Sequence, residues 1–294
     1  MDTRIGLDKM RVRYTYGNSI SGNADYQRLQ GWVGSSLMGD FGTKGKLQKV
    51  HPEGSLTNVH QKLPEGGYLH LMYGEAGKKQ SLWVEFNPAK LSANDLAALK
   101  GHLSILLEDG FATLVYSGWM SRVEINIDVD GAVFGDYLYV DTSLRTSNAA
   151  YEHSGTMYIG GQKSNRRFTV YDKSKEQSYG GIYAAPTLRV EAILQNRKGF
   201  PLAQTIVQPS PFLTLLILNR AALGKSSDPT VGEFIKRAKA PGHSAQAAYQ
   251  SFPLKQRKGL QQALQELQPA WWQPANIWCG FPASLGWMAY LAEP

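Results

Sequence analysis

A tyrosine with basic neighbours is the residue of this chain best suited to nucleophilic chemistry. Tyr171 ends a short alternating run that begins at Arg167, and Lys173 follows two residues later. Because side chains alternate between the faces of a strand, Phe168 and Val170 point one way and Tyr171 points the other. A phenol on a polar face in basic surroundings can attack a phosphate of nucleic acid. The alternative is a surface hairpin whose tyrosine packs against lysine stems.

Carboxylates crowd one face of another predicted strand. The run Arg122–Asp130 alternates strictly, and Glu124 and Asp128 lie on its polar face. An antiparallel strand with a solvated face explains the alternation, but like charges on one face repel. A divalent cation, Mg²⁺ or Mn²⁺, would relieve that repulsion. Glu124 and Asp128 are roughly 13 Å apart along a straight strand, so we expect one of them to ligate together with Glu191 and the other to hold a positive group.

Positive charge is concentrated in two segments. Residues 158–198 contain eight Lys or Arg against three Asp or Glu, and residues 225–258 contain seven against two. With a net charge of +7 and a pI near 9.3, this predicts a polyanionic partner. The predicted DNA contacts are Lys163, Arg166, Lys175, Arg189, Arg257 and Lys258.

The composition is that of an ordinary globular protein. Hydrophobic residues make up 43% and charged residues 19% of the 294 positions. Cys279 is the single cysteine, which excludes an intramolecular disulfide and a multi-cysteine metal cage. The N-terminus lacks the apolar core of a signal peptide, and the longest apolar run, Phe212–Leu218, is too short to span a bilayer. We therefore expect a soluble, cytoplasmic protein. No glycine-rich nucleotide-binding motif and no H-x-H histidine pair occurs.

The elements that must position these side chains can be read from periodicity and end signals. Ser92 and Asp95 form a capping box that opens a leucine-rich helix. Four tryptophans in the last 25 residues indicate a tail docked on the core, with base stacking as the alternative. The other expected elements are strands at Arg11–Tyr16, Gly31–Leu37, Tyr68–Tyr73, Ser81–Phe86, Ala112–Tyr116 and Thr187–Leu194, and helices at Phe212–Leu223, Val231–Ala240 and Ser244–Leu267.

This order of elements predicts an α+β fold. A largely antiparallel sheet domain with helices on one face is expected over residues 1–205, followed by a helical, DNA-binding or docking region over residues 206–294. Val-Glu pairs at Glu85, Glu124 and Glu191 recur in strand-like runs. They indicate either an internal duplication of the sheet domain or only a dipeptide that is common in strands.

Four motifs, in order, resemble the rolling-circle replication initiation factors of plasmids and filamentous phages, which are topoisomerase-like nicking initiators. Residues 121–128, SRVEINID, are similar to the family's R-x-D-x-x-x-D strand, with Glu124 in place of the first Asp. Residues 157–164, MYIGGQKS, resemble its Y-x-G-x-x-x-S run. Residues 170–176, VYDKSKE, and 188–191, LRVE, resemble its Y-x-K-x-x-E and R-x-E motifs. The resemblance covers about residues 80–195.

The resemblance implies a metal-dependent DNA strand transferase with Tyr171 as its nucleophile. Tyr171 would attack a phosphate at a replication origin, keep a 5′-phosphotyrosine and release a 3′-OH primer for a host polymerase working with a host helicase. Lys173, or Arg167 across the strand, would favour the ionised phenol, and the predicted metal ligands are drawn from Glu124, Asp128 and Glu191. A single nucleophile suggests a homodimer. The competing interpretation is an origin-binding or regulatory protein without chemistry.

Overall fold

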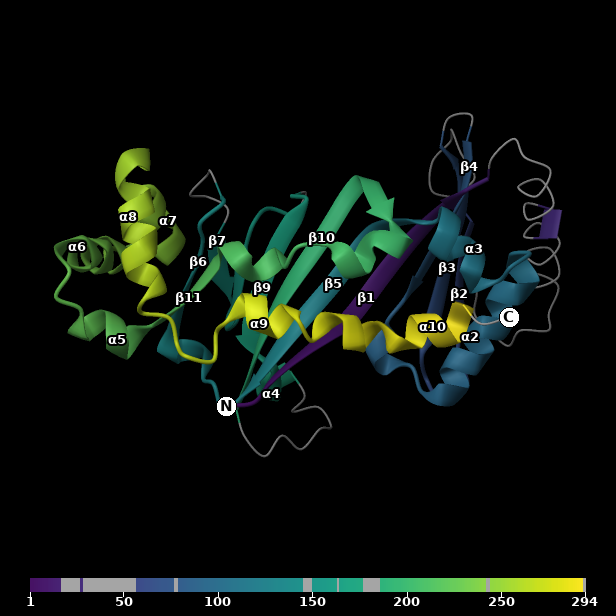
Figure 1. Cartoon of the computed structure of the whole chain (residues 1–294), viewed down its shortest axis with the longest axis horizontal. Coiled ribbons are helices and arrows are strands. Elements are labelled where there is room, and N and C mark those ends of the chain that lie inside the picture. The colour runs from purple at the N-terminus through teal and green to yellow at the C-terminus, as the bar shows by residue number, and fades with distance from the viewer. Residues whose placement is uncertain are drawn as a thin grey trace. The chain divides into compact units, whose positions relative to one another are not determined.

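The computed structural model describes residues 1–16, 27–28, 57–76, 79–144, 150–162, 164–176, 186–241 and 244–292. Within these ranges the fold is α+β, with a large antiparallel sheet and C-terminal helices, as predicted (Figure 1). The strands are β1 Thr3–Thr15, β2 Thr57–Lys62, β3 Tyr68–Ala76, β4 Lys79–Phe86, β5 Trp119–Asp130, β6 Tyr137–Asp141, β7 Ala150–His153, β8 Thr156–Ile159, β9 Arg166–Asp172, β10 Thr187–Pro201 and β11 Leu215–Asn219.

Helices connect and cover these strands. The α-helices are α2 Ala93–Leu106, α3 Phe111–Ser117, α4 Lys173–Glu176, α5 Arg220–Lys225, α6 Pro229–Ala238, α7 Ala245–Gln250, α8 Leu254–Gln265, α9 Pro274–Trp278 and α10 Gly286–Ala292. The 3₁₀ turns are η1 Pro88–Lys90, η2 Phe134–Asp136, η5 Leu202–Val207, η6 Pro211–Thr214 and η7 Phe281–Leu285. In the part of the chain that the structure describes, no helix combines the length and the apolar character needed to cross a bilayer.

The nine-stranded sheet has the order β2-β3-β4-β1-β5-β10-β9-β8-β7, and β11 and β6 form a separate pair. The chain divides into two compact units that are discontinuous in sequence. The first unit comprises Met1–Gly6, Ile125–Leu194 and Pro209–Phe281, and the second comprises Leu7–Glu124, Gln195–Gln208 and Pro282–Pro294. The domain division at residues 205 and 206 stays a prediction.

In the first unit, the apolar residues of β5, β9 and β10 form one buried face, because each strand alternates as its sequence predicts. Phe168 lies on this face, and the ring centroid of Phe212 is 6.0 Å from that of Phe168. Trp272 is buried and donates from Nε1 to the carbonyl of Leu215 at 2.9 Å, which bears out the predicted docking of the tryptophan-rich segment.

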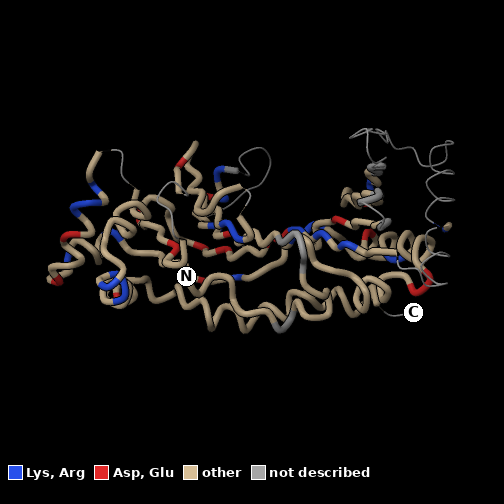
Figure 2. The backbone as a smooth tube through the Cα atoms, turned by 90° about the horizontal axis from the view of Figure 1, so that it is seen from above, with Lys and Arg blue, Asp and Glu red and all other residues tan. Residues whose placement is uncertain are grey.

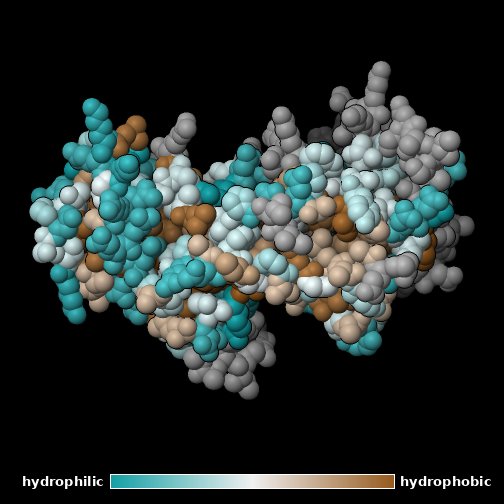
Figure 3. Space-filling view, viewed as in Figure 1, coloured by the Kyte–Doolittle hydropathy of each residue, from teal (hydrophilic) through white to brown (hydrophobic). Residues whose placement is uncertain are grey.

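Helices α5 to α8 of the first unit pack around the β6–β11 pair (Figure 1). Phe234, Tyr249 and Leu264 are among the side chains buried in this second core. The side of these helices turned toward the viewer is largely hydrophilic (Figure 3). The single helix predicted over Ser244–Leu267 is wrong: it is divided into α7 and α8, because Pro253 cannot donate the backbone hydrogen bond that would continue α7.

In the second unit, β2, β3, β4 and β1 pair antiparallel in this order, and α2, α3 and α10 lie on one side of the sheet strands (Figure 1). The predicted capping box at the start of α2 is confirmed, since Ser92 and Asp95 satisfy each other's backbone N–H groups. Trp287 packs its ring edge-on against Phe86 and Phe111, with centroids 5.4 and 5.9 Å away. This contact docks the C-terminal helix.

Two further predicted elements are wrong. The strand expected at Ala112–Tyr116 is helix α3, in which Phe111 and Leu114, three residues apart, turn to the same buried side. The helix expected at Phe212–Leu223 consists of η6, strand β11 and α5. A short apolar run fits a buried strand and a buried helix equally well, and here pairing of β11 with β6 decides for the strand. The strand expected at Gly31–Leu37 lies outside the described residues.

Glu85, the carboxylate of the first Val-Glu pair, is held on β4 of the second unit by cations. Arg11 donates from Nε to Oε2 of Glu85 at 2.6 Å, and the Nζ of Lys9 lies 2.9 Å from Oε1. Burial disfavours the charged form of Glu85, but hydrogen bonds from His70 and Lys9 and the charge of Arg11 outweigh it and hold the pKa of Glu85 well below its usual range.

We therefore expect Glu85→Gln to lower the free energy of unfolding at pH 7 by about 1–3 kcal/mol, because a charge-assisted hydrogen-bond acceptor is lost. Glu85 has a depressed pKa in the folded state. Its stabilisation is thus complete above the ordinary carboxyl pKa of about 4.3 and is lost as the pH falls below it. Urea unfolding at several pH values checks this. A difference between the two proteins that stays constant from pH 7 to pH 3 would contradict it.

Candidate active site

The hairpin of β9 and β10 in the first unit brings the predicted nucleophile to a carboxylate. The two strands pair antiparallel, with Tyr171 opposite Arg189 and Thr169 opposite Glu191. Phe168 and Val170 are fully buried on the core face, so Thr169 and Tyr171 occupy the other face, as alternation predicts. The register therefore places the polar side chains of both strands on one surface.

Tyr171 is hydrogen-bonded to Glu191. Its Oη donates to Oε1 of Glu191 at 2.7 Å. This distance lies in the range over which a general base can take a proton from a nucleophile. The sequence predicted both residues as site residues, but as nucleophile and metal ligand rather than as a hydrogen-bonded pair. The contact identifies Glu191 as the group positioned to accept the phenolic proton.

Arg189 and Lys173 supply the positive charge beside this pair. Arg189 donates to both oxygens of Asp128, from Nε at 2.5 Å and from Nη2 at 2.6 Å, and its Nη1 lies 3.9 Å from Oε1 of Glu191. The Nζ of Lys173 lies 3.8 Å from Oδ2 of Asp128. The exposed fractions of the Arg189 and Lys173 side chains are only 8% and 10%, so water screens these charges weakly. We call Tyr171, Glu191, Arg189, Asp128 and Lys173 the tyrosine cluster.

Asn126 supports the cluster from β5. With its amide oriented to satisfy both neighbours, its oxygen accepts from Nη2 of Arg189 at 2.9 Å and its nitrogen donates to the carbonyl of Gly6 at 3.0 Å. A Cβ at position 6 would stand 3.0 Å from the amide atom of Asn126 that faces it, so glycine allows this close approach. Asn126 is absent from the predicted site, although its place on the polar face of an alternating run is a usable signal.

The predicted metal ligands do not form a metal site as they are arranged. Within the described residues, no group of three or more His, Cys, Asp or Glu side chains could hold a metal ion. Asp128 is engaged by Arg189 and Glu191 by Tyr171. Glu124 lies in the second unit and accepts from Nε of Arg122 at 2.7 Å. As they are arranged, these three carboxylates do not fit a hard cation, which needs free oxygen ligands. Ligation by the three carboxylates stays a prediction.

Arg167 and Arg166 have contacts other than Tyr171. Arg167 and Tyr171 are four positions apart, roughly 13 Å along a strand, and the Arg167 guanidinium lies 5.7 Å from the ring centroid of Tyr158. Arg166 forms an ion pair with Asp141, at 3.0 Å between Nη2 and Oδ2. The help of Arg167 in ionising Tyr171 and the contact of Arg166 with DNA both stay predictions.

The remaining predicted DNA contacts differ in exposure. The Lys175 side chain is 82% exposed, and Lys258 is exposed on α8. Arg257 donates from Nε to the carbonyl of Phe252 at 2.8 Å and from Nη2 to Gln250, so it caps the end of α7. Lys163 lies outside the described residues, as do the alternative nucleophiles Tyr179 and Tyr183. Figure 2 shows Lys and Arg interspersed with Asp and Glu along the strands, and Lys and Arg on α8.

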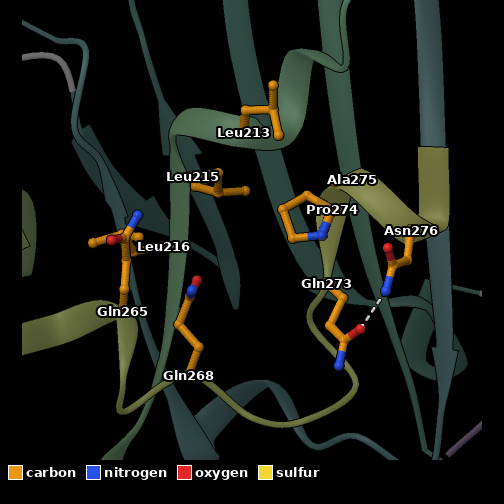
Figure 4. Close-up of a pocket in the computed structure, with 9 residues that line it drawn as sticks. All are labelled: Leu213, Leu215, Leu216, Gln265, Gln268, Gln273, Pro274, Ala275 and Asn276. Carbon is orange, nitrogen blue, oxygen red and sulfur yellow. Dashed lines mark hydrogen bonds between the residues drawn. The ribbon is translucent and has the colours of Figure 1, made fainter. Parts of the chain in front are cut away.

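A pocket of about 250 Å³ in the first unit lies apart from the predicted residues (Figure 4). It is bounded by η6, β11, the end of α8 and α9, and its lining contains no charged side chain. Asn276 donates to Oε1 of Gln273 across its rim at 2.5 Å. Its volume falls below the roughly 300 Å³ at which small-molecule sites begin, and it lacks groups for a phosphate. The tyrosine cluster is therefore the better candidate site.

A comparison of the sequence with protein-family models and with curated proteins finds no match. Among solved structures, the fold is similar to that of a rolling circle replication initiator protein from Geobacillus stearothermophilus. The two chains are 13% identical, the TM-score is 0.38, and the match covers 79% of this chain and 91% of the other. At this level the likeness carries no conclusion about activity, which has to come from the site itself.

Proposed function

We propose that this protein is a rolling-circle replication initiator that nicks one DNA strand at an origin. The observation that carries the proposal is the 2.7 Å hydrogen bond from Tyr171 Oη to Glu191 Oε1, beside the weakly exposed cations Arg189 and Lys173. A nucleophile, a base and positive charge at one place are the parts that transfer of a phosphoryl group to tyrosine requires. The motif resemblance of residues 80–195 supports the same reaction.

In the proposed step, the proton of Tyr171 passes to Glu191 while the phenolic oxygen attacks a backbone phosphorus. A bond between Oη and phosphorus forms, and the bond from phosphorus to the 3′-oxygen breaks. The products are a 5′-phosphotyrosine and a 3′-hydroxyl that takes up a proton from solvent and serves as primer. One phosphodiester is exchanged for another, so no nucleotide triphosphate is consumed.

The cations of the tyrosine cluster act on the phosphate. The two carboxylates of Asp128 and Glu191 balance Arg189 and Lys173, and transfer of the phenolic proton to Glu191 leaves these four groups with a net charge of +1 while negative charge develops on the phosphate. The short contacts of Asp128 hold the Arg189 fork in one orientation. Because the side chains are weakly exposed, their attraction for charge developing on the phosphate oxygens is stronger than at an exposed surface.

The test uses a supercoiled plasmid that carries the cognate origin, incubated with the protein and Mg²⁺ or Mn²⁺. We expect open-circular DNA with protein bound covalently at its 5′-end, and no ATP requirement. The competing function, an origin-binding protein without chemistry, predicts a retarded but still supercoiled plasmid. Binding in either case should weaken with salt, because exposed cations such as Lys175 and Lys258 release phosphate counterions when they contact DNA. A supercoiled product under all conditions, with intact binding, would overturn the nicking proposal.

A further inference from the structure

Two tyrosines stack on the sheet face that carries the tyrosine cluster. Tyr151 on β7 lies opposite Tyr158 on β8, and their ring centroids are 4.9 Å apart with an interplanar angle of 22°. Tyr158 lies opposite Thr169 on β9, which in turn lies opposite Glu191 on β10. These four residues therefore form one row across four neighbouring strands, with Glu191 at its end.

The two stacked tyrosine rings of this row differ in their surroundings. The Arg167 guanidinium lies over the Tyr158 ring, 5.7 Å from its centroid, so Tyr158 contacts both Arg167 and Tyr151. Tyr151 is 47% exposed, on the terminal strand of the sheet. Aromatic rings on exposed strands stack readily on the flat faces of unpaired bases. The outer face of Tyr151 is thus available to a planar ligand.

Two polar atoms between the stack and the cluster lack partners. Arg167 Nε and Thr169 Oγ1 are buried, and neither has a hydrogen bond to another described residue. Thr169 is only 7% exposed. A buried donor without an acceptor is uncommon and calls for a physical reason. The Arg167 side chain as a whole is half-buried, so its positive charge can attract an anionic ligand, such as a phosphate, that lies across β9.

We propose that Tyr151, supported by Tyr158, is a stacking site for an unpaired base of single-stranded DNA, and that Arg167 attracts the backbone that leads from this base to Tyr171. The inference rests on the proposed strand transfer and specifies its substrate as a single strand. Tyr151 is two strands from β9, about 10 Å across the sheet. Tyr158 and Tyr171 are diagonal neighbours, about 7–8 Å apart at Cα. A short stretch of single strand covers these distances.

The test measures binding without cleavage, in the Tyr171→Phe background. The probe is a single-stranded origin oligonucleotide that carries 2-aminopurine, whose fluorescence falls on stacking, at successive positions near the nick. With Tyr151 intact we expect quenching at one position. Tyr151→Leu should abolish the quenching and weaken binding by roughly tenfold, whereas Tyr151→Phe, which keeps the ring, should retain both. Tyr68→Leu, at another exposed strand tyrosine, is the matched control.

Arg167→Gln gives a second readout. Removing one phosphate contact should reduce the slope of log affinity against log salt by about 0.7 for a single strand. Unchanged quenching in Tyr151→Leu would overturn the inference even if the protein nicks DNA. Ring-dependent quenching in a protein that never nicks would support the stacking site and overturn only the proposed strand transfer, so the two failures are distinguishable.

Discussion

Tyr171→Phe is expected to abolish both nicking and the covalent protein–DNA adduct, with a rate loss on the order of 10⁴-fold or more, because the attacking oxygen is absent. The substitution keeps the ring and removes the Oη that donates to Glu191 at 2.7 Å. Stability should fall by about 1.5–3 kcal/mol, the value of one hydrogen bond to a charged group. Origin binding should persist. Gel assays of plasmid opening and mass spectrometry of the trapped wild-type adduct provide the measurements.

The adduct peptide distinguishes Tyr171 from its neighbours in the chain. Wild-type protein should carry the nucleotide on the peptide that contains Tyr171. Tyr179→Phe and Tyr183→Phe serve as controls and should nick normally. DNA attached at position 179 or 183, or an adduct formed by Tyr171→Phe, would show that another residue is the nucleophile.

Glu191→Gln is expected to slow nicking by about 10²–10⁴-fold, the usual contribution of a general base. Glutamine keeps the size of the side chain and can still contact Tyr171, but it cannot take the phenolic proton. The paired contacts of Arg189 with Asp128 involve neither Glu191 oxygen, so DNA binding should be retained. Raising the pH should restore part of the rate, because hydroxide then ionises the phenol directly. Single-turnover rates across a pH series test this.

Glu124→Gln separates the roles of base and metal ligand. Glu124 contacts Arg122 on its own strand. If Glu191 acts as the base, the nicking rate of Glu191→Gln should rise with pH. The dependence of that rate on Mn²⁺ concentration should then match that of the wild type. If the carboxylates ligate a metal as the sequence predicts, both Gln variants should need more Mn²⁺, and neither should be rescued by pH. The second result would show that Glu191 is a metal ligand and not the general base.

Much of the sheet was predictable because the alternation of apolar and polar residues is a local property. The run Arg122–Asp130 shows alternating faces in the sequence and forms most of β5. The same argument placed Tyr171 on the polar face of β9. Capping of α2 by Ser92 was equally local, since its partner Asp95 is three residues away.

Local signals were insufficient where an apolar segment has no clear period. In residues 212–223, leucine and isoleucine follow neither the period of a strand nor that of a helix. Only pairing with β6 made the segment around Leu216 a strand. Phe111–Ser117 is rich in residues found in strands, yet the burial of Phe111 and Leu114 on one side makes it helical. In both cases long-range packing overrides intrinsic propensity.

The sequence by itself determined which residues share the polar face: Tyr171 from one strand, Arg189 and Glu191 from another, and Asp128 from a third. Only the tertiary structure decided which of them meet. The register of β9 and β10 brings the Tyr171 hydroxyl to Glu191, and a slip of one residue would turn Glu191 to the core face. The structure pairs Asp128 with Arg189, so Asp128 holds a positive group, as was expected for one of the two carboxylates Glu124 and Asp128. Contacts between residues 20 and 61 positions apart depend on strand order and register, which no local pattern contains.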